Sequence, residues 1–371
     1  MNRSRLCPKI RYSPIFTPSR TLWYAIACCA LTLTLDAGVA GQTVSYPCEP
    51  SPVVKHALRE LADVLREDTL MTVEQRKEQG LAILRPLLDK YPDDLFVHRR
   101  YQDFIRYSGE DQLEELINRY RTLLEKRQGD PLYLYLYARL LIGRQTQEAL
   151  SALQKDLQRS PHFPWAHLAL VEIYQTPSYR DKQKSQAHLE TFMTLCPSSL
   201  DAYDFLRGID DLEFIRKSAK KLRTLVESQT DLDNVSSYQT LWQLEFRARP
   251  AAKHAEVRQQ IETDLSRLRQ SNLANELRSL RTLYEGYRTT NNAEGLRWAG
   301  DQIVQRFPHS RAARSLIQER WDAEHPYPRP NDPPEKAQAY FQALLRVTGE
   351  WTRRWPDDPA GWLRRLDAVR E

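Results

Sequence analysis

Glycine is scarce in this chain, with 12 residues in 371. The backbone therefore has few positions for left-handed turns or for the loops that hold phosphate groups. No phosphate-binding glycine loop, dinucleotide-binding glycine pattern, HExxH zinc motif or nucleophile elbow occurs in the sequence. The five cysteines include no C-x-x-C pair, which excludes a zinc ribbon and a dithiol redox motif. These absences predict a protein that is not an enzyme and that holds no cofactor or metal.

Long hydrophobic runs are also missing. The longest uncharged apolar run, Leu22 to Leu35, has 14 residues, whereas a helix that spans a bilayer needs roughly 20. Five basic residues precede this run and the small residues of Asp36 to Ala40 follow it, as in a secretory signal peptide. An uncleaved anchor would be too short, and a lipoprotein modified at Cys28 would have too short an apolar run before it. We therefore predict a signal peptide over residues 1–40, cleaved after Ala40, and an exported protein, periplasmic or secreted, that is not held in a membrane.

Little excess charge is left once this segment is removed. The formal net charge is +5, but residues 1–40 hold five basic residues and one acidic residue, so +1 remains for residues 41–371. This balance argues against nucleic-acid binding, which needs a strongly basic surface. A basic run between Arg216 and Arg223 could contact phosphate or acidic lipid. The same helix carries an apolar stripe made of Leu212, Ile215, Ala219, Leu222 and Val226. We therefore interpret the basic run as the solvated face of an amphipathic helix.

Two cysteines, Cys48 and Cys196, lie outside the predicted signal peptide. Export would place them where disulfides persist, and closing a loop of this length would stabilise the fold by roughly 4 to 5 kcal/mol on the chain-entropy model. Alternatively Cys196, at the buried end of a helix, packs as a small hydrophobic residue. The sequence leaves both interpretations open.

Helical periodicity is clearest from Ser160 to Pro197, where two helical segments meet at Thr176-Pro177. In the first segment His167, Leu170, Val171 and Tyr174 are spaced at i, i+3, i+4 and i+7, which is one face of a helix. The second segment ends at Cys196-Pro197, because proline has no N–H with which to continue a helix.

Similar residues recur at fixed distances before other prolines. The residues twelve, eight and five positions earlier are Gly80, Leu84 and Leu87 before Pro92; Ser185, Leu189 and Phe192 before Pro197; Leu296, Gly300 and Ile303 before Pro308; and Leu344, Thr348 and Trp351 before Pro356, while Ala149 and Leu153 precede Pro161 in the same frame. From Pro92 through Pro131 and Pro161 to Pro197 the spacings are 39, 30 and 36 residues, close to a helix-turn-helix repeat of roughly 34 residues.

On these residues the chain resembles the tetratricopeptide repeat (TPR) family, from Gly80 to about Gly208 and again before Pro308 and Pro356. The repeats are degenerate. The family's small residue in the first helix is replaced by Gln102, Leu141 and Val171, and its first aromatic residue is represented by His98, Tyr137 and His167. We interpret His98 and His167 as core residues with satisfied hydrogen bonds. The resemblance implies an all-α fold, an α-solenoid of stacked antiparallel helix pairs in a right-handed superhelix, whose concave groove binds a protein or peptide.

The remaining segments complete a prediction for the whole chain. Leu132 to Ile142 alternates like a strand, but it follows Asp130-Pro131, a good helix start, and we predict a helix. Longer helices are expected between Asp210 and Phe307, where Pro250 is the only proline. The domains are therefore a signal peptide (1–40), a TPR-like solenoid (41–324), a proline-rich linker (325–334) and a C-terminal helical hairpin (335–371). With five prolines in ten residues, the linker should run extended and hold the hairpin loosely.

The resemblance also implies which residues contact a partner. In the family these are first-helix positions between the packing residues, and they correspond here to Phe96, Arg99, Asp103 and Arg106 in one helix, Tyr135 and Ala138 in the next, Trp165, Glu172 and Gln175 in the third, and Asp201 and Asp204 in the fourth. Ordinary surface or packing between repeats is the alternative for each of them, and Trp165 could simply anchor a helix start.

A second resemblance concerns the segments HFPWAHLALVEIY and LCPSSLDAY. They look like the helical half of exported bacterial proteins whose other half is thioredoxin-like. Two functions follow: an exported bacterial scaffold, without catalytic activity, that binds a protein or peptide in its groove, or a helical companion of an extracytoplasmic thiol-redox system with a thioredoxin-like partner.

Overall fold

The structure is a computed structural model that describes residues 46–64, 73–106, 110–228, 235–356 and 359–370. The predicted signal peptide, its cleavage site and Cys28 lie outside these residues. Within the described part of the chain, no helix is both long enough and apolar enough to cross a membrane.

The described residues form α-helices and short 3-10 helices, without a strand. The helices up to Gly208 are α2 (Pro52–Val64), α3 (Val73–Lys90), α4 (Leu95–Arg106), α5 (Glu110–Lys126), α6 (Pro131–Leu141), α7 (Thr146–Arg159), α8 (Pro164–Gln175), η1 (Pro177–Tyr179), α9 (Lys182–Leu195) and η2 (Tyr203–Gly208). Those that follow are α10 (Leu212–Ser228), α11 (Ser237–Ala248), η4 (Ala251–Lys253), α12 (His254–Gln270), α13 (Leu277–Thr290), α14 (Ala293–Arg306), α15 (Arg311–Glu324), α16 (Pro334–Arg354) and α17 (Pro359–Arg370).

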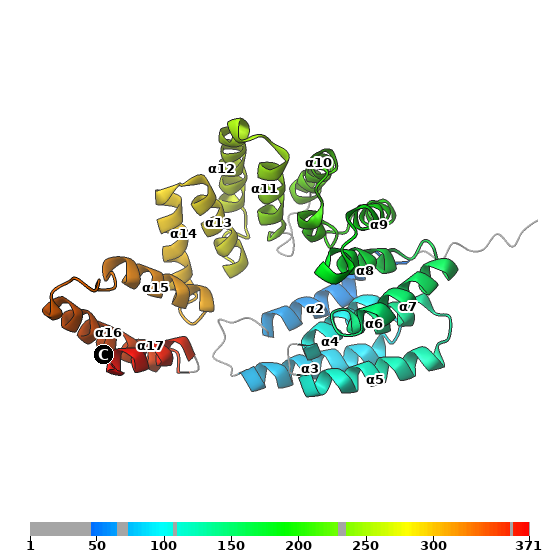
Figure 1. Cartoon of the computed structure of the whole chain (residues 1–371), viewed down its shortest axis with the longest axis horizontal. Helices are drawn as coiled ribbons and strands as arrows, with labels where there is room; N and C mark the ends of the chain where they lie inside the picture. Colours follow the sequence, from blue (N-terminus) through cyan, green and yellow to red (C-terminus); the bar gives the residue numbers. More distant parts are fainter. Residues whose placement is uncertain (1–45, 65–72, 107–109, 229–234, 357–358, 371) are drawn as a thin grey trace, which may run out of the picture. The chain divides into compact units, whose positions relative to one another are not determined.

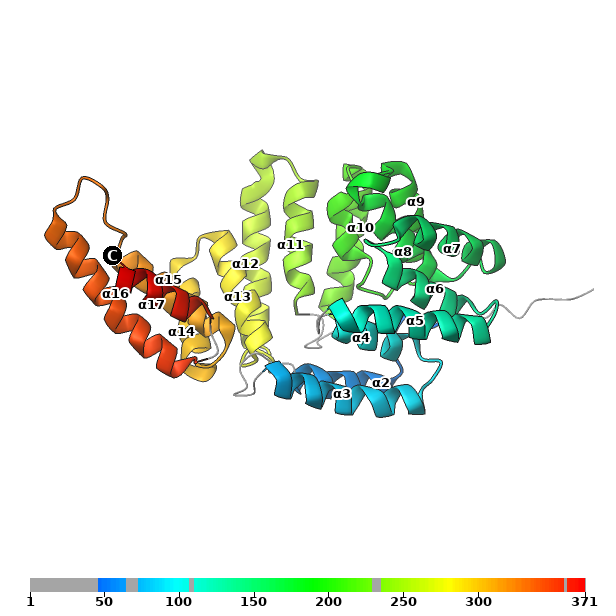
Figure 2. The same cartoon turned by 60° about the horizontal axis from the view of Figure 1, so that its bottom comes forward.

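Helices pack mainly on their neighbours along the chain, in antiparallel pairs joined by short turns (Figures 1 and 2). Tight pairs are α6 with α7, α8 with α9, α10 with α11, α13 with α14 and α16 with α17. Helices two places apart also touch: α4 contacts α6, and α6 contacts α8. This is the stacked-pair α-solenoid that the sequence predicted, in which each unit is stabilised by the units beside it.

The recurring prolines mark one type of helix end. Ser160, Cys196, Phe307 and Trp355 each end a helix with φ between −127° and −133°, and each is followed by a proline. The N–H of each of the four still donates to the carbonyl four residues earlier. Since proline forces the residue before it out of the helical region, the repeated X-Pro step ends these helices at the same point of the repeat.

Helix α8 forms the centre of the best-defined repeats, with ten of its twelve residues buried. His167 on this helix and His98 on α4 are core residues, as predicted. Their Nε2 atoms contact the carbonyls of Pro161 and Pro92 at 3.0 and 2.7 Å, six residues earlier in each case. The equivalent contacts support a structural repeat that the sequence only partly shows.

Several local predictions can be compared with the structure. Leu132 to Ile142 is helical, as α6, and Asp130 caps it by accepting a hydrogen bond from the N–H of Leu132 at 2.9 Å. The expectation of longer helices after Asp210 is wrong: α10 and α12 have 17 residues, but α11 has 12 and the earlier α3 has 18. The predicted buried stripe of α10 is right apart from Leu212, which is 50% exposed.

The C-terminal hairpin α16–α17 is held more firmly than predicted. Arg364 forms two hydrogen bonds of 2.9 and 2.8 Å with the Asp322 carboxylate on α15. The indole N–H of Trp355 donates to the carbonyl of Pro308 at 3.1 Å. The linker is irregular, as expected, but Pro334 already belongs to α16 and Pro328 is buried. Side-chain contacts therefore dock the hairpin that the linker alone was expected to tether.

Cys48 and Cys196 are bonded in the structure, with their Cα atoms 5.3 Å apart. Cys196 caps the end of α9, and Cys48 lies in the segment before α2. Beside the bond, the indole N–H of Trp165 donates to the carbonyl of Pro47 at 3.0 Å. The two contacts fix the segment before α2 on the α8–α9 pair.

Asp156 occupies a place that is apolar in the other repeats. It lies five residues before Pro161, where Leu87, Phe192 and Ile303 precede their own prolines, and it is 1% exposed. Its Oδ2 atom has no hydrogen-bond partner among the described residues. Burial, together with the nearby Asp130, raises the pKa of Asp156 to about 8. The protonated form is therefore the one that suits the fold.

We expect Asp156→Asn to stabilise the protein increasingly as the pH rises from 4 to 8. Because the pKa is raised in the folded state, the unfolded chain loses this proton near pH 4 while the folded chain keeps it, so the wild-type protein loses stability across this range. The gain at pH 8 should be on the order of a few kcal/mol. Thermal unfolding at pH 4.5 and pH 8 measures it, with the exposed Lys155→Ala as a control on the same helix. An equal effect of Asp156→Asn at both pH values would contradict a titrating buried carboxyl.

Candidate functional site

The predicted partner-binding residues lie on helices that touch one another in a row. Helix α4 contacts α6, α6 contacts α8, and α8 contacts η2. We call the face of α4, α6, α8 and η2 that carries these residues the row surface. Figure 2 shows α4, α6 and α8 as successive elements of the stack. Side chains from residues about a hundred positions apart in sequence can therefore form one surface.

Arg99 is the centre of the row surface. Its guanidinium lies 4.3 Å from the ring centroid of Trp165, and its Nη1 donates to Oδ2 of Asp201 at 3.1 Å. Phe96 and Phe192 each make an edge-to-face contact with the Trp165 ring, with 5.4 Å between centroids in both cases. The cation is thus fixed between an aromatic ring and a carboxylate, an arrangement stabilised by cation–π attraction.

Arg99 stays protonated, but its Nε donor has no hydrogen-bond acceptor in the described part of the chain. Burial alone would lower its pKa, but the phenol of Tyr135 and the carboxylate of Asp201 outweigh burial and raise it. The Arg99 side chain is 19% exposed and that of Asp201 is 43% exposed. The Nε atom is buried and has no acceptor among the described residues. Arg99 therefore combines a permanent charge with partial accessibility, while its unused Nε donor lies on the buried side.

A second charged group lies beside the first and includes a residue that the sequence analysis missed. Arg139 on α6 forms an ion pair with Asp103 and donates to Oε1 of Gln102 at 3.0 Å. The amide of Gln102 in turn donates to the carbonyl of Leu136 at 2.8 Å. Gln102 stands where the repeat family has a small residue, and here it connects α4 to α6 instead. The available signal for Arg139 was that it is the only charged residue from Leu132 to Ile142.

Not all of the predicted contact residues are accessible, and three are corrected here. Tyr135, Ala138 and Trp165 are at most 3% exposed, so these side chains pack between helices and are unable to touch a partner in this structure. Trp165 acts on the surface only indirectly, by supporting Arg99.

Two further corrections concern position and role. Asp201 and Asp204 do not belong to a fourth α-helix: Asp201 lies in a turn and Asp204 in η2. Gln175 is used internally, since its amide donates to Ser185 Oγ at 3.2 Å and to the carbonyl of Phe205 at 2.8 Å. The predicted residues that stay wholly or partly exposed are Phe96, Arg99, Asp103, Arg106, Glu172, Asp201 and Asp204.

The row surface carries side chains of both charges. It combines arginines, carboxylates and one partly exposed aromatic side chain, Phe96. Among the described residues of the whole chain, no three His, Cys, Asp or Glu side chains converge as metal ligands. A mixed, rigid surface of this kind is suited to recognising a polypeptide that carries charges of both signs.

Comparisons with known proteins add the following. No protein-family model matches the chain, and no curated protein matches it. A chain in the solved structure of Naa15/Naa10 bound to HypK-THB is similar over 85% of this chain and 50% of its own length, with 12% identity and a TM-score of 0.30. This chain thus spans about half the length of that one, and a similarity at this level carries no argument about function.

Proposed function

We propose that this chain is an exported TPR-like scaffold, without catalytic activity, that binds a protein or peptide on the row surface. The observation that carries the proposal is the fixed Arg99: its charged side chain is held over Trp165 of α8, is paired with Asp201 in the turn before η2, and stays partly exposed. Ordinary surface arginines are flexible and lose much side-chain entropy on binding. A pre-positioned arginine avoids that cost, as expected of a residue that anchors a ligand.

Two features support export. Residues 1–40 have the basic, apolar and small-residue segments of a signal peptide. The Cys48–Cys196 disulfide belongs with compartments that are oxidising. Mass spectrometry of the protein recovered from the extracytoplasmic fraction tests both, and we expect a chain that begins at Gly41 and lacks two hydrogens relative to the reduced form.

Peptide binding provides the test of the row surface. Peptides selected from a random displayed library on the wild-type protein should bind Arg99→Ala at least tenfold more weakly, a loss of about 1.4 kcal/mol. The matched control is Arg100→Ala, which removes the same charge from the next residue of α4, where the side chain is exposed and points elsewhere on the helix. Its affinity should stay within twofold of wild type. Circular dichroism should show equal helicity for all three proteins.

The outcome against the proposal is equally definite. If Arg99→Ala and Arg100→Ala bind the selected peptides as the wild type does, the row surface is not the binding surface. If both variants weaken binding equally, the effect is one of overall charge, and the placement of Arg99 over Trp165 has no part in recognition.

A further inference from the structure

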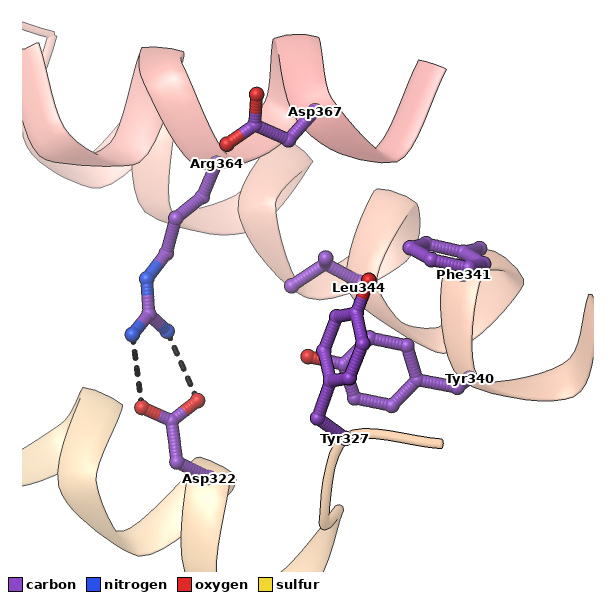
Figure 3. A pocket seen from close by; sticks show the side chains of 7 residues that line it. All are labelled: Asp322, Tyr327, Tyr340, Phe341, Leu344, Arg364 and Asp367. Atoms are coloured by element: carbon purple, nitrogen blue, oxygen red, sulfur yellow. Dashed lines mark hydrogen bonds and ion pairs between the residues drawn. The ribbon is translucent and has the colours of Figure 1, made fainter. Parts of the chain in front are cut away.

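A cavity of about 390 Å³ lies in the C-terminal part of the chain, on helices that do not contribute to the row surface. Its lining comes from α15, the linker, α16 and α17, and comprises Asp322, Tyr327, Tyr340, Phe341, Leu344, Arg364 and Asp367. Figure 3 shows the three aromatic rings grouped on one side and the Asp322–Arg364 pair on the other. This volume is in the range of small-molecule sites.

The three rings of the cavity stand nearly at right angles to one another. Tyr327 and Tyr340 are inclined by 69°, Tyr327 and Phe341 by 86°, and Tyr340 and Phe341 by 82°, with centroids 5.3 to 6.1 Å apart. Rings in this arrangement are not stacked face to face, so their faces are not all covered by each other. Three differently oriented aromatic rings at one place form the kind of cage that surrounds a cation.

The charges of the lining favour a cation as well. Asp322 is neutralised by Arg364 through two hydrogen bonds of 2.9 and 2.8 Å, drawn as dashed lines in Figure 3. Asp367, one turn further along α17, has no basic side chain within ion-pair distance among the described residues. The lining therefore carries one carboxylate more than its single arginine compensates. A cation would offset this charge, whereas an anion would be repelled by it.

Tyr327 lines the cavity, and its side chain is not part of the buried core. This side chain is 67% exposed and comes from the linker, between Pro326 and Pro328. Pro328 is buried, and the carboxylate of Asp332 accepts hydrogen bonds from the N–H of Arg329 at 2.7 Å and from Lys336 at 2.9 Å. The prolines restrict the backbone of the linker, and the contacts of Asp332 connect the linker to the start of α16. The Tyr327 side chain is therefore positioned before any ligand binds.

From these observations we infer that the cavity binds a quaternary ammonium group, with Tyr327, Tyr340 and Phe341 around the methyl groups and Asp367 near the charge. Methylated ammonium suits the site better than a primary amine, because its weakly hydrated charge is transferred from water to aromatic faces more easily. The group could belong to a free small molecule or to a lipid headgroup. The site is independent of the row surface and does not rest on the function proposed for it.

Choline is the probe for this proposal, and 3,3-dimethyl-1-butanol is its uncharged counterpart of the same shape. Titration calorimetry of the mature protein should show choline bound at least tenfold more tightly than the alcohol. Tyr327→Ala should weaken choline binding at least tenfold, and because this ring is mostly exposed the variant should fold with unchanged helicity. Asp367→Asn should weaken choline binding and leave the alcohol unaffected. Glu350→Gln, an exposed carboxylate on α16, is the matched control and should change neither.

Equal binding of choline and the alcohol would identify a merely apolar cavity and overturn the inference, as would no binding of choline at millimolar concentration. Unchanged choline affinity in both Tyr327→Ala and Asp367→Asn would place the ligand elsewhere and also overturn it. Flotation with phosphatidylcholine vesicles, against phosphatidylglycerol vesicles, separates the two sources: a headgroup ligand should carry the protein with the former only, and a free ligand with neither.

Discussion

Reduction of the Cys48–Cys196 disulfide should lower the stability of the helices between these residues by about 5 kcal/mol, since the bond closes a loop with a sequence separation of 148 residues. The loop contains α2 to α9, including the part of the row surface that lies on α4, α6 and α8. Once the bond is cut, the hydrogen bond from Trp165 to the carbonyl of Pro47 still links this segment to α8. Urea unfolding with and without dithiothreitol, followed by hydrogen exchange in α8 and α9, measures the loss where it should occur.

The double variant Cys48→Ala/Cys196→Ala is the control for this prediction. It should unfold like the reduced wild type and should not respond to dithiothreitol, and α12 to α14, outside the loop, should exchange as before. Solenoids unfold in parts, so local exchange is a better measure than a single midpoint. Two reactive thiols in the unfolded, unreduced wild-type protein, or an unchanged urea midpoint after reduction, would contradict the prediction.

Much of the fold could be predicted because helix ends and apolar stripes are local properties. The closing prolines mark helix ends in the sequence, and the same residues end α7, α9, α14 and α16 in the structure. The strand-like alternation of Leu132 to Ile142 was correctly assigned to a helix because Asp130-Pro131 is a helix start. What could not be predicted is which side chains from distant repeats meet. The docking of the hairpin through Arg364 and Asp322 is an example.

In the candidate site, too, the helical positions could be predicted from the sequence but the burial and partners of the side chains could not. A repeat frame indicates which positions lie on the first helix of each pair, but it does not show how deep each one is buried. Trp165 and Tyr135 look like groove residues by position and are core residues in the structure, because neighbouring rings such as Phe192 and Phe163 cover them. The Arg99–Asp201 pair joins residues 102 positions apart, which no local pattern could predict.

Arg223 is another residue whose partners the sequence did not predict. Within the basic run of α10, Arg216, Lys217, Lys220 and Lys221 are exposed, which agrees with a solvated face. Arg223 instead reaches inward. Its Nε and Nη2 donate to the Glu245 carboxylate at 2.8 Å each, and its Nη1 donates to Oδ1 of Asp264 at 3.0 Å. Asp264 is 0% exposed and also accepts from the indole of Trp242 at 2.9 Å. One arginine therefore connects α10, α11 and α12.

We expect Arg223→Met to destabilise this part of the chain by about 3–5 kcal/mol, because two carboxylates would be left in a buried site without a cation. Arg216→Met, which removes an exposed charge from the same helix, should change stability by less than about 0.5 kcal/mol. Urea unfolding followed by hydrogen exchange in α10, α11 and α12 measures both. Similar effects of the two substitutions would show that the buried network contributes nothing beyond surface charge.

The pH dependence separates loss of charge compensation from loss of packing. Burial already raises the pKa of Glu245, although Arg223 opposes this effect. Without Arg223 the folded-state pKa rises further, so the variant should regain stability as the pH falls toward the unfolded-state value near 4, whereas a packing defect would persist at every pH. The triple variant Arg223→Met/Glu245→Gln/Asp264→Asn removes the charges and keeps an acceptor for Trp242. It should recover most of the loss at pH 7. If the triple variant is as unstable as Arg223→Met alone, the three residues act through shape, and the uncompensated carboxylates are not the cause.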